Sequence, residues 1–192
     1  MKYPGNVPEV VSREINGSVV TINYDKENSK ITYSFTPKNK EDEEWQPYTI
    51  EEVKDGDKIT KTFKGSEGVL GITEIVTSEH QKEITDKDKD GNIKSIQTFD
   101  FVNNKKITKQ MKDEIINGFG EIKAGIREEY YNKQGDLTSE INRDLDGKIN
   151  TIDEYIIENG VNYVVHKNAK GETISKVECE QRYEKEFDVS DF

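Results

Sequence analysis

The chain has few of the residues from which catalytic and metal sites are usually built. Its 192 residues include one cysteine, Cys179, and two histidines, His80 and His166. A single cysteine excludes an intrachain disulfide, and so few cysteines and histidines leave little for a zinc site or a Ser-His-Asp system. The sequence also has no glycine-rich phosphate-binding loop. These absences predict that the protein is not an enzyme.

Apolar residues are also scarce, at 31% of the chain against 35% charged residues. That share is too small for a deep core on all sides. Disorder is the alternative for such a composition, but Ile, Val, Tyr, Phe and Thr recur in strand-like runs. A thin sheet with one well-covered face fits better.

No apolar run is long enough to span a membrane, and the first residues lack the apolar segment of a signal peptide. We therefore expect a cytoplasmic protein, or a mature or trimmed part of a secreted or surface protein.

Positive charge is the minority, with 28 Lys and Arg against 39 Asp and Glu and a net charge of −11. A nucleic-acid-binding protein needs a basic stripe to neutralise phosphates, and the summed field of this chain opposes one. The acidity instead favours a basic partner or bound cations.

What the chain does contain is a regular series of turn signals, most of them 11 to 14 residues apart, with no helical segments between them. Short strands at this spacing predict an all-β fold, here an antiparallel meander of about 11–13 strands. The sheet is expected to be single, extended and twisted, or partly curled into a roll or barrel. We expect an extended lead-in at residues 1–13, one β-meander domain at 14–187 and a tail at 188–192.

Alternation of apolar and polar residues supports strands, as in Val20-Thr-Ile22-Asn-Tyr24 and Ile31-Thr-Tyr33-Ser-Phe35. Residues 107–118 are the exception, because Ile107, Met111 and Ile115 have helical spacing. The regular turn spacing favours a strand in this segment, and helix is the alternative.

Two loops carry Asp or Asn at positions 1, 3 and 5 before a glycine, which is the first half of a calcium-binding loop. The candidate ligands are Asp86, Asp88 and Asp90 in one loop, and Asn142, Asp144 and Asp146 in the other. The loops resemble the EF-hand loop, and equally the Asp-x-Asp-x-Asp-Gly repeats of secreted bacterial proteins. They depart from the EF-hand because position 12 is Gln97 or Asp153 instead of Glu, and no helix pattern precedes them. The alternative is that Asp-Gly only forms a tight hairpin turn.

Residues 79–178 carry a second, looser motif, seen in Glu129-Tyr130-Tyr131-Asn132-Lys-Gln-Gly135-Asp-Leu137 and in Asp153-Glu-Tyr155-Ile-Ile-Glu-Asn159-Gly160. It resembles the Tyr-Tyr-x-x-Gly-x-Leu repeats of bacterial MORN-variant proteins (the YwqK-type antitoxin family) and of YD-repeat proteins. The resemblance implies a sheet of consecutive hairpins that binds other molecules and does not catalyse reactions.

Three functions are consistent with these patterns. The first is a bacterial binding module that presents one sheet face to a protein partner, with an antitoxin or immunity role implied by the resemblance. The second is a calcium-stabilised structural module of a secreted or surface protein, and the third is a barrel-like carrier of a small apolar ligand. Because tyrosine and tryptophan are enriched at binding hot spots, the candidate partner-binding residues are Tyr130, Tyr155, Tyr163 and Trp45. Tyr130 and Tyr131 are neighbours on one strand, so only one of them can lie on a given face.

Overall fold

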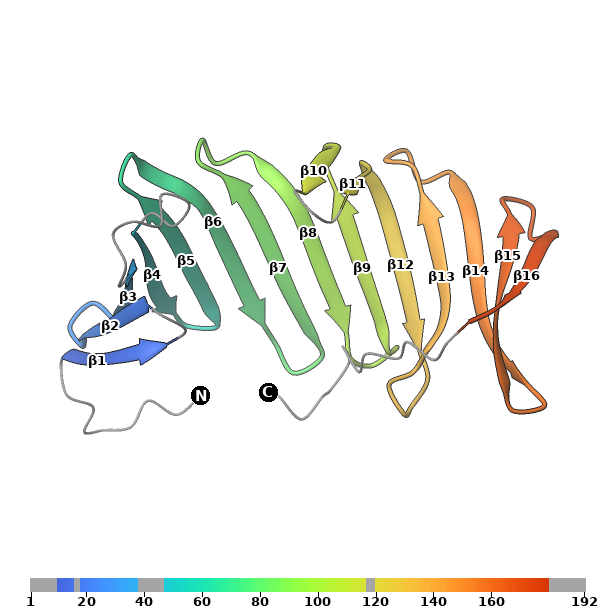
Figure 1. Ribbon diagram of the computed structural model, residues 1–192, viewed down its shortest axis with the longest axis horizontal. Coiled ribbons are helices and arrows are strands. Elements are labelled where there is room, and N and C mark those ends of the chain that lie inside the picture. Colours follow the sequence, from blue (N-terminus) through green and yellow to red (C-terminus); the bar gives the residue numbers. More distant parts are fainter. Residues whose placement is uncertain (1–9, 16–17, 38–46, 117–119, 180–192) are drawn as a thin grey trace. The chain divides into compact units, whose positions relative to one another are not determined.

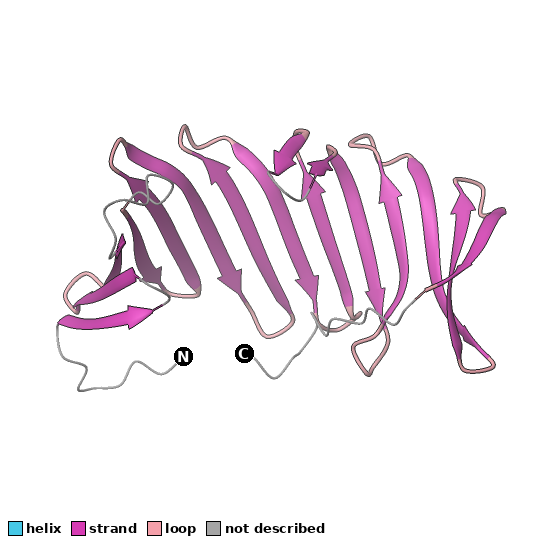
Figure 2. Ribbon diagram, viewed as in Figure 1, coloured by secondary structure: helices cyan, strands magenta, loops and turns pink. Residues whose placement is uncertain are grey.

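The computed structural model describes residues 10–15, 18–37, 47–116 and 120–179, and over these residues it contains only strands and turns (Figures 1 and 2). The strands are β1 (Val10–Ile15), β2 (Ser18–Asp25), β3 (Lys30–Pro37), β4 (Tyr48–Asp55), β5 (Lys58–Gly65), β6 (Gly68–Thr77), β7 (Gln81–Asp88), β8 (Ile93–Asp100), β9 (Lys105–Gln110), β10 (Glu114–Ile116), β11 (Gly120–Ile122), β12 (Gly125–Tyr131), β13 (Leu137–Arg143), β14 (Ile149–Glu158), β15 (Val161–Asn168) and β16 (Thr173–Glu178).

Fourteen of these strands form one antiparallel meander in chain order, and β10 and β11 form a separate hairpin between β9 and β12. The order ends at β1 and β16, and the sheet does not close into a barrel. The all-β meander predicted from the turn spacing is therefore confirmed. The structure has more strands than the expected 11–13. The additional ones are β1, which starts inside the segment expected to be a lead-in, and β10 and β11, which are only three residues long.

The structure can be compared with the prediction at the two ends of the chain and at residues 107–118, for which strand and helix were both considered. Residues 10–13 of the expected lead-in belong to β1, which pairs with β2, whereas residues 1–9 and the expected tail at 188–192 lie outside the described residues. Residues 107–116 contain β9 and β10 and no helix, so the strand prediction is confirmed for this part of the chain.

The chain divides into two compact units, which are described separately. Unit 1 comprises Met1–Ser78 and Ile84–Ile93, and unit 2 comprises Glu79–Glu83 and Lys94–Phe192.

In unit 1 the register gives the sheet one apolar face and one polar face. Direct cross-strand partners share a face, so the pairs Val20–Phe35, Ile22–Tyr33 and Ile50–Phe63 place their side chains together. The rings of Phe35 and Tyr48 stack with centroids 4.5 Å apart. The other face carries mainly Thr, Ser, Lys and Glu, and on it Lys30 and Lys64 both form ion pairs with Glu51.

Burial is shallow throughout the described residues. The buried apolar side chains are Val20, Tyr131 and Val165, and no described side chain has a relative exposure under 2%. The free energy gained from the hydrophobic effect is proportional to the apolar area removed from water. This sheet therefore relies on backbone pairing and cross-strand contacts more than a two-layer domain does. Much of its side-chain surface stays accessible.

Candidate functional site

The first acidic loop is a hairpin turn between β7 and β8 in unit 1. The Asp88 carboxylate accepts hydrogen bonds from the backbone N–H groups of Asp90 and Asn92, at 3.0 and 2.8 Å. Asp86 lies earlier on β7, where its carboxylate accepts a 2.7 Å hydrogen bond from the Thr73 hydroxyl. Asp90 is exposed and forms a 3.5 Å ion pair with Lys89. The three residues predicted as calcium ligands therefore have three different sets of contacts.

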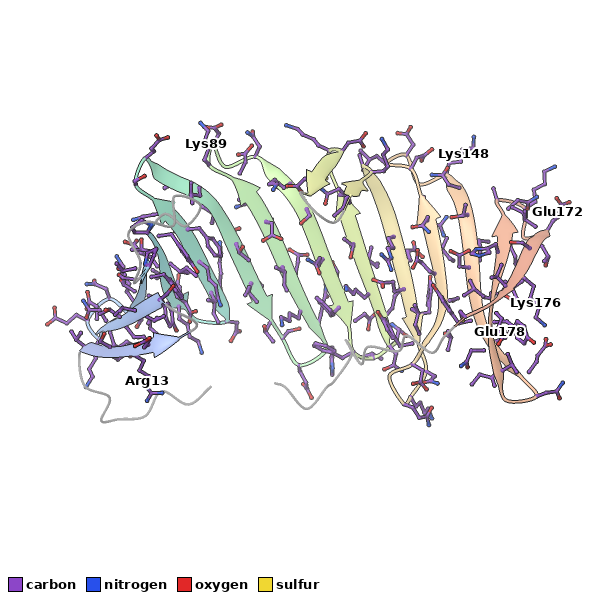
Figure 3. All side chains as sticks on the ribbon, viewed as in Figure 1. Arg13, Lys89, Lys148, Glu172, Lys176 and Glu178 are labelled. Carbon is purple, nitrogen blue, oxygen red and sulfur yellow. The ribbon has the colours of Figure 1, made fainter. Side chains whose placement is uncertain are left out.

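The second acidic loop, between β13 and β14 in unit 2, has the same form. Asp144 accepts a hydrogen bond from the backbone N–H of Lys148, while Asn142 lies on β13 and donates to Glu140 and Thr151. Asp146 is exposed at the turn. Figure 3 labels Lys89 and Lys148, which mark these two turns.

Two further turns show that the acidic residues are not needed for this geometry. Asn132 and Asn168 occupy the position of Asp88 and Asp144, and each accepts from the backbone N–H groups two and four residues later. In all four turns the glycine three residues after the capping residue has a φ between +81° and +86°, which favours glycine. The side chain of Asp or Asn thus caps a hairpin turn, a role that explains the spacing without a metal.

No group of three or more His, Cys, Asp or Glu side chains is arranged to hold a metal ion among the described residues. Calcium binding at Asp86, Asp88 and Asp90, or at Asn142, Asp144 and Asp146, stays a prediction.

Substitution of Asp88 distinguishes a role in capping the turn from a role as a calcium ligand. We expect Asp88→Ala to lower the free energy of unfolding by about 1 kcal/mol, because two backbone N–H groups lose their acceptor. Asp88→Asn should change it by less than about 0.5 kcal/mol, because Asn132 and Asn168 cap equivalent turns. Urea denaturation in millimolar calcium and in chelator measures both. A calcium-dependent rise in wild-type stability that Asp88→Asn abolishes would support a metal site and contradict a purely structural turn.

The predicted partner-binding tyrosines do not share one face of unit 2. Tyr130 is the direct partner of Ser139, which pairs with Glu154, which pairs with Val165, so all four lie on one face. Tyr163 lies on that face too, two residues before Val165. Lys105 and Lys176 lie over the rings of Tyr130 and Tyr163, at 4.8 and 4.2 Å from the ring centroids.

Tyr155 follows Glu154 on β14 and therefore points to the opposite face. Tyr131 is buried next to a β-bulge between Tyr130 and Tyr131. Trp45 lies outside the described residues. Because Tyr155 faces away from Tyr130 and Tyr163, no single face presents all three.

The face that carries Tyr155 also carries a row of carboxylates, which we call the acidic row: Glu129, Glu140 and Asp153. These residues are direct partners on β12, β13 and β14. The row is flanked by a cation at one end, since Lys106 is the partner of Glu129, and by His166 at the other, as the partner of Asp153. The face of unit 2 with this row is called the acidic face below.

Like charges directly opposite each other destabilise a sheet, and Arg127 offsets this repulsion. Its guanidinium lies 3.2 Å from a carboxylate oxygen of Glu129 and 2.8 Å from one of Glu140. Lys106 lies 3.7 Å from the other oxygen of Glu129, whose side chain is only 7% exposed. Burial opposes the charge on Arg127, but Glu140 and Glu129 outweigh it and raise its pKa. At the far end of the row, Asp153 and His166 Nδ1 are 2.7 Å apart.

Beside the acidic row lies the apolar patch, formed by Tyr155, Ile157, Val164 and Val177. Tyr155 pairs with Val164, Val164 pairs with Val177, and Ile157 follows two residues after Tyr155 on the same face. Ile157 is 63% exposed and Val177 is 51% exposed. Burial, together with the charges of Glu140 and Asp153, raises the pKa of Tyr155 to about 12. The phenol therefore stays a neutral hydrogen-bonding group at physiological pH.

Of this surface, only Tyr155 was predicted from the sequence as a site residue. Arg127, the acidic row, Ile157 and Val177 were not predicted, because no motif marks them and they come from separate strands. The pairing register is the signal that identifies them, since it aligns three carboxylates that are 11 and 13 residues apart in the chain.

No family model matches this chain, and no curated protein matches it either. The resemblance of residues 79–178 to MORN-variant and YD-repeat proteins is not tested by these comparisons and stays a prediction. Among the described residues, no helix has the length and apolar character needed to cross a membrane.

Proposed function

We propose that this protein is a non-catalytic binding module whose acidic face binds a protein partner. The observation that carries the proposal is the apolar patch, in which Ile157 and Val177 are more than half exposed on the same face as three aligned carboxylates. Exposed apolar side chains grouped beside polar ones are typical of protein interaction sites.

The chemistry of the face favours a partner that combines apolar and basic side chains. The apolar patch supplies the area to be buried, and Tyr155 is the residue type enriched at hot spots. The net charge of −11 would steer a basic partner toward the protein and raise its association rate. An antitoxin or immunity role is the most specific version of this proposal, and it is supported only by the resemblance to the MORN-variant family.

The third hypothesis, a barrel-like carrier of a small apolar ligand, relied on a closed interior. The sheet does not close into a barrel, and we do not propose this function.

Photo-crosslinking tests the proposed face. Benzoylphenylalanine at position 157 is expected to form an adduct with a discrete protein in an extract of the source organism. The matched control is position 102, because Val102 is 65% exposed, slightly more than Ile157, but lies in the turn between β8 and β9.

The same two positions supply a competition test. Ile157→Arg removes apolar area and adds a charge that repels a basic partner, so this variant should compete at least about tenfold more weakly for adduct formation. Val102→Arg should compete like the wild type, and thermal melting shows whether both variants fold. Equal adducts at positions 157 and 102, or equal competition by the two variants, would contradict the acidic face as the binding surface.

A further inference from the structure

The last strand of the meander, β16, has one neighbour among the described residues, β15. The backbone N–H of Cys179 donates to the carbonyl of Asn162, which makes this pair hydrogen-bonded in the antiparallel ladder. Hydrogen-bonded and non-hydrogen-bonded pairs alternate, so Val177 points its N–H and C=O toward β15. Lys176 and Glu178 point theirs away from it. β16 therefore presents a short row of backbone donors and acceptors to a further strand.

The side chains of this row are complementary to themselves. If two copies of β16 pair antiparallel around Val177, Lys176 of each copy is directly opposite Glu178 of the other. These pairs use the outward backbone groups, and opposite charges at direct partner positions stabilise a sheet. Figure 3 labels both residues on β16.

The other end strand lacks this property. Its adjacent charges, Arg13 and Glu14, are neighbours on β1, so their backbone groups point to opposite sides. A symmetric antiparallel pair cannot place these two residues opposite each other.

The same pairing extends the apolar patch. Tyr155, Val164 and Val177 lie in one cross-strand row on β14, β15 and β16. A second copy related by a twofold axis between the two Val177 residues would continue the row through its own Val177, Val164 and Tyr155. Val177, which is 51% exposed in the single chain, would then pack against its symmetry mate.

We propose that β16 pairs with β16 of a second copy, antiparallel and centred on Val177. The occupant is a second copy because the complementary charges are two residues apart, which is the spacing that a symmetric pair requires. The contact is a short strand, and each copy carries a net charge of −11, so the dimer is weak and depends on protein concentration. It uses the sheet edge and, apart from Val177, leaves the acidic row and the apolar patch of both copies open, so it goes beyond the proposed function.

Charge exchange tests the register of the pairing. In analytical ultracentrifugation, the wild type should shift from monomer to dimer as its concentration rises. Glu178→Lys and Lys176→Glu place like charges opposite each other, and each should weaken self-association at least about tenfold. An equimolar mixture of the two variants restores both Lys–Glu pairs and should dimerise like the wild type. A wild type that stays monomeric at millimolar concentration, or variants that associate as strongly as it does, would overturn the proposal.

Disulfide crosslinking tests the same register by a second route. It is needed because Lys176→Glu also loses the ion pair with Glu158 and could destabilise β16 for that reason. In a Cys179→Ser background treated with oxidised glutathione, Val177→Cys should form an intermolecular disulfide, because the two residues at the axis face each other. Ser175→Cys, on the same face but two residues from the axis, should not. Equal crosslinking of both variants would refute the register. Lys176 and Glu178 lie on the face opposite the acidic face, as the partners of Val165 and Tyr163, so the charge-exchange test and the partner-binding test can fail independently.

Discussion

Gly125→Ala is expected to lower the free energy of unfolding by about 3 kcal/mol, because an added methyl group meets a more severe clash there than at the other described glycines. A Cβ atom on Gly125 would lie 2.6 Å from the backbone carbonyl oxygen of Arg143 on the neighbouring strand. Real Cβ atoms do not approach an oxygen so closely, and the obstacle is backbone. The start of β12 must therefore move away from β13, at the cost of ladder hydrogen bonds.

The matched control is Gly147→Ala in the same unit. A Cβ atom there meets nothing within 4 Å, and only the positive φ of +86° opposes it. We expect a loss of about 1 kcal/mol, the usual cost of a left-handed residue that is not glycine. Urea denaturation of both variants measures the difference, and equal losses would mean that β12 and β13 are not held at this separation.

Arg127→Ala is expected to lower the free energy of unfolding by about 2 kcal/mol. Removal of one partner from a buried ion pair costs about 3–5 kcal/mol, and the 51% exposure of the Arg127 side chain reduces this figure. Without the guanidinium, Glu129 and Glu140 are directly opposite each other, and Glu129 is nearly buried. Their repulsion is the main source of the expected loss.

A second substitution shows whether repulsion is the cause. Glu140→Gln in the Arg127→Ala background removes one of the two charges and should recover at least about half of the lost stability. Arg143→Ala is the control, because its partner Glu128 keeps hydrogen bonds from Lys105 and Tyr130. Its expected cost is about 0.5–1 kcal/mol. If Glu140→Gln gives no recovery, Arg127 stabilises the sheet through packing of its aliphatic stem and not through its charge.

Much of the fold could be predicted from local sequence signals, namely the turn glycines and the alternation of apolar and polar residues. The turn glycines Gly91, Gly135, Gly147, Gly160 and Gly171 all have positive φ, and the strands between them alternate as expected. In unit 1 the alternation correctly predicts that Val20, Ile22 and Tyr24 share a face.

The prediction becomes incomplete where a bulge intervenes. The register shifts at Phe63 and Lys64, so Phe63 pairs with Gly71 and Thr62 with Ile72. The apolar Ile72 and Val76 consequently lie on the polar face of unit 1, and hydrophobic pattern alone does not reveal this.

The candidate site depends even more on register. Tyr155 and Tyr163 can be placed on opposite faces from the sequence, because the two-residue turn at Asn159 and Gly160 makes Val164 the partner of Tyr155. The alignment of Glu129 with Glu140 cannot be obtained in this way, since it depends on the bulge at Tyr130 and Tyr131. Charged residues are abundant in the chain, and only the pairing selects these two.

The chain-order pairing of the strands has a consequence for folding kinetics. Nearly every strand pairs with the strand that follows it, and the one interruption is the short β10–β11 hairpin between β9 and β12. Closing a loop costs entropy that grows with its length, and here almost every loop to be closed is a hairpin turn. The described strands pair with segments that are near them in the chain, so the contact order is low for an all-β protein. Low contact order favours fast folding.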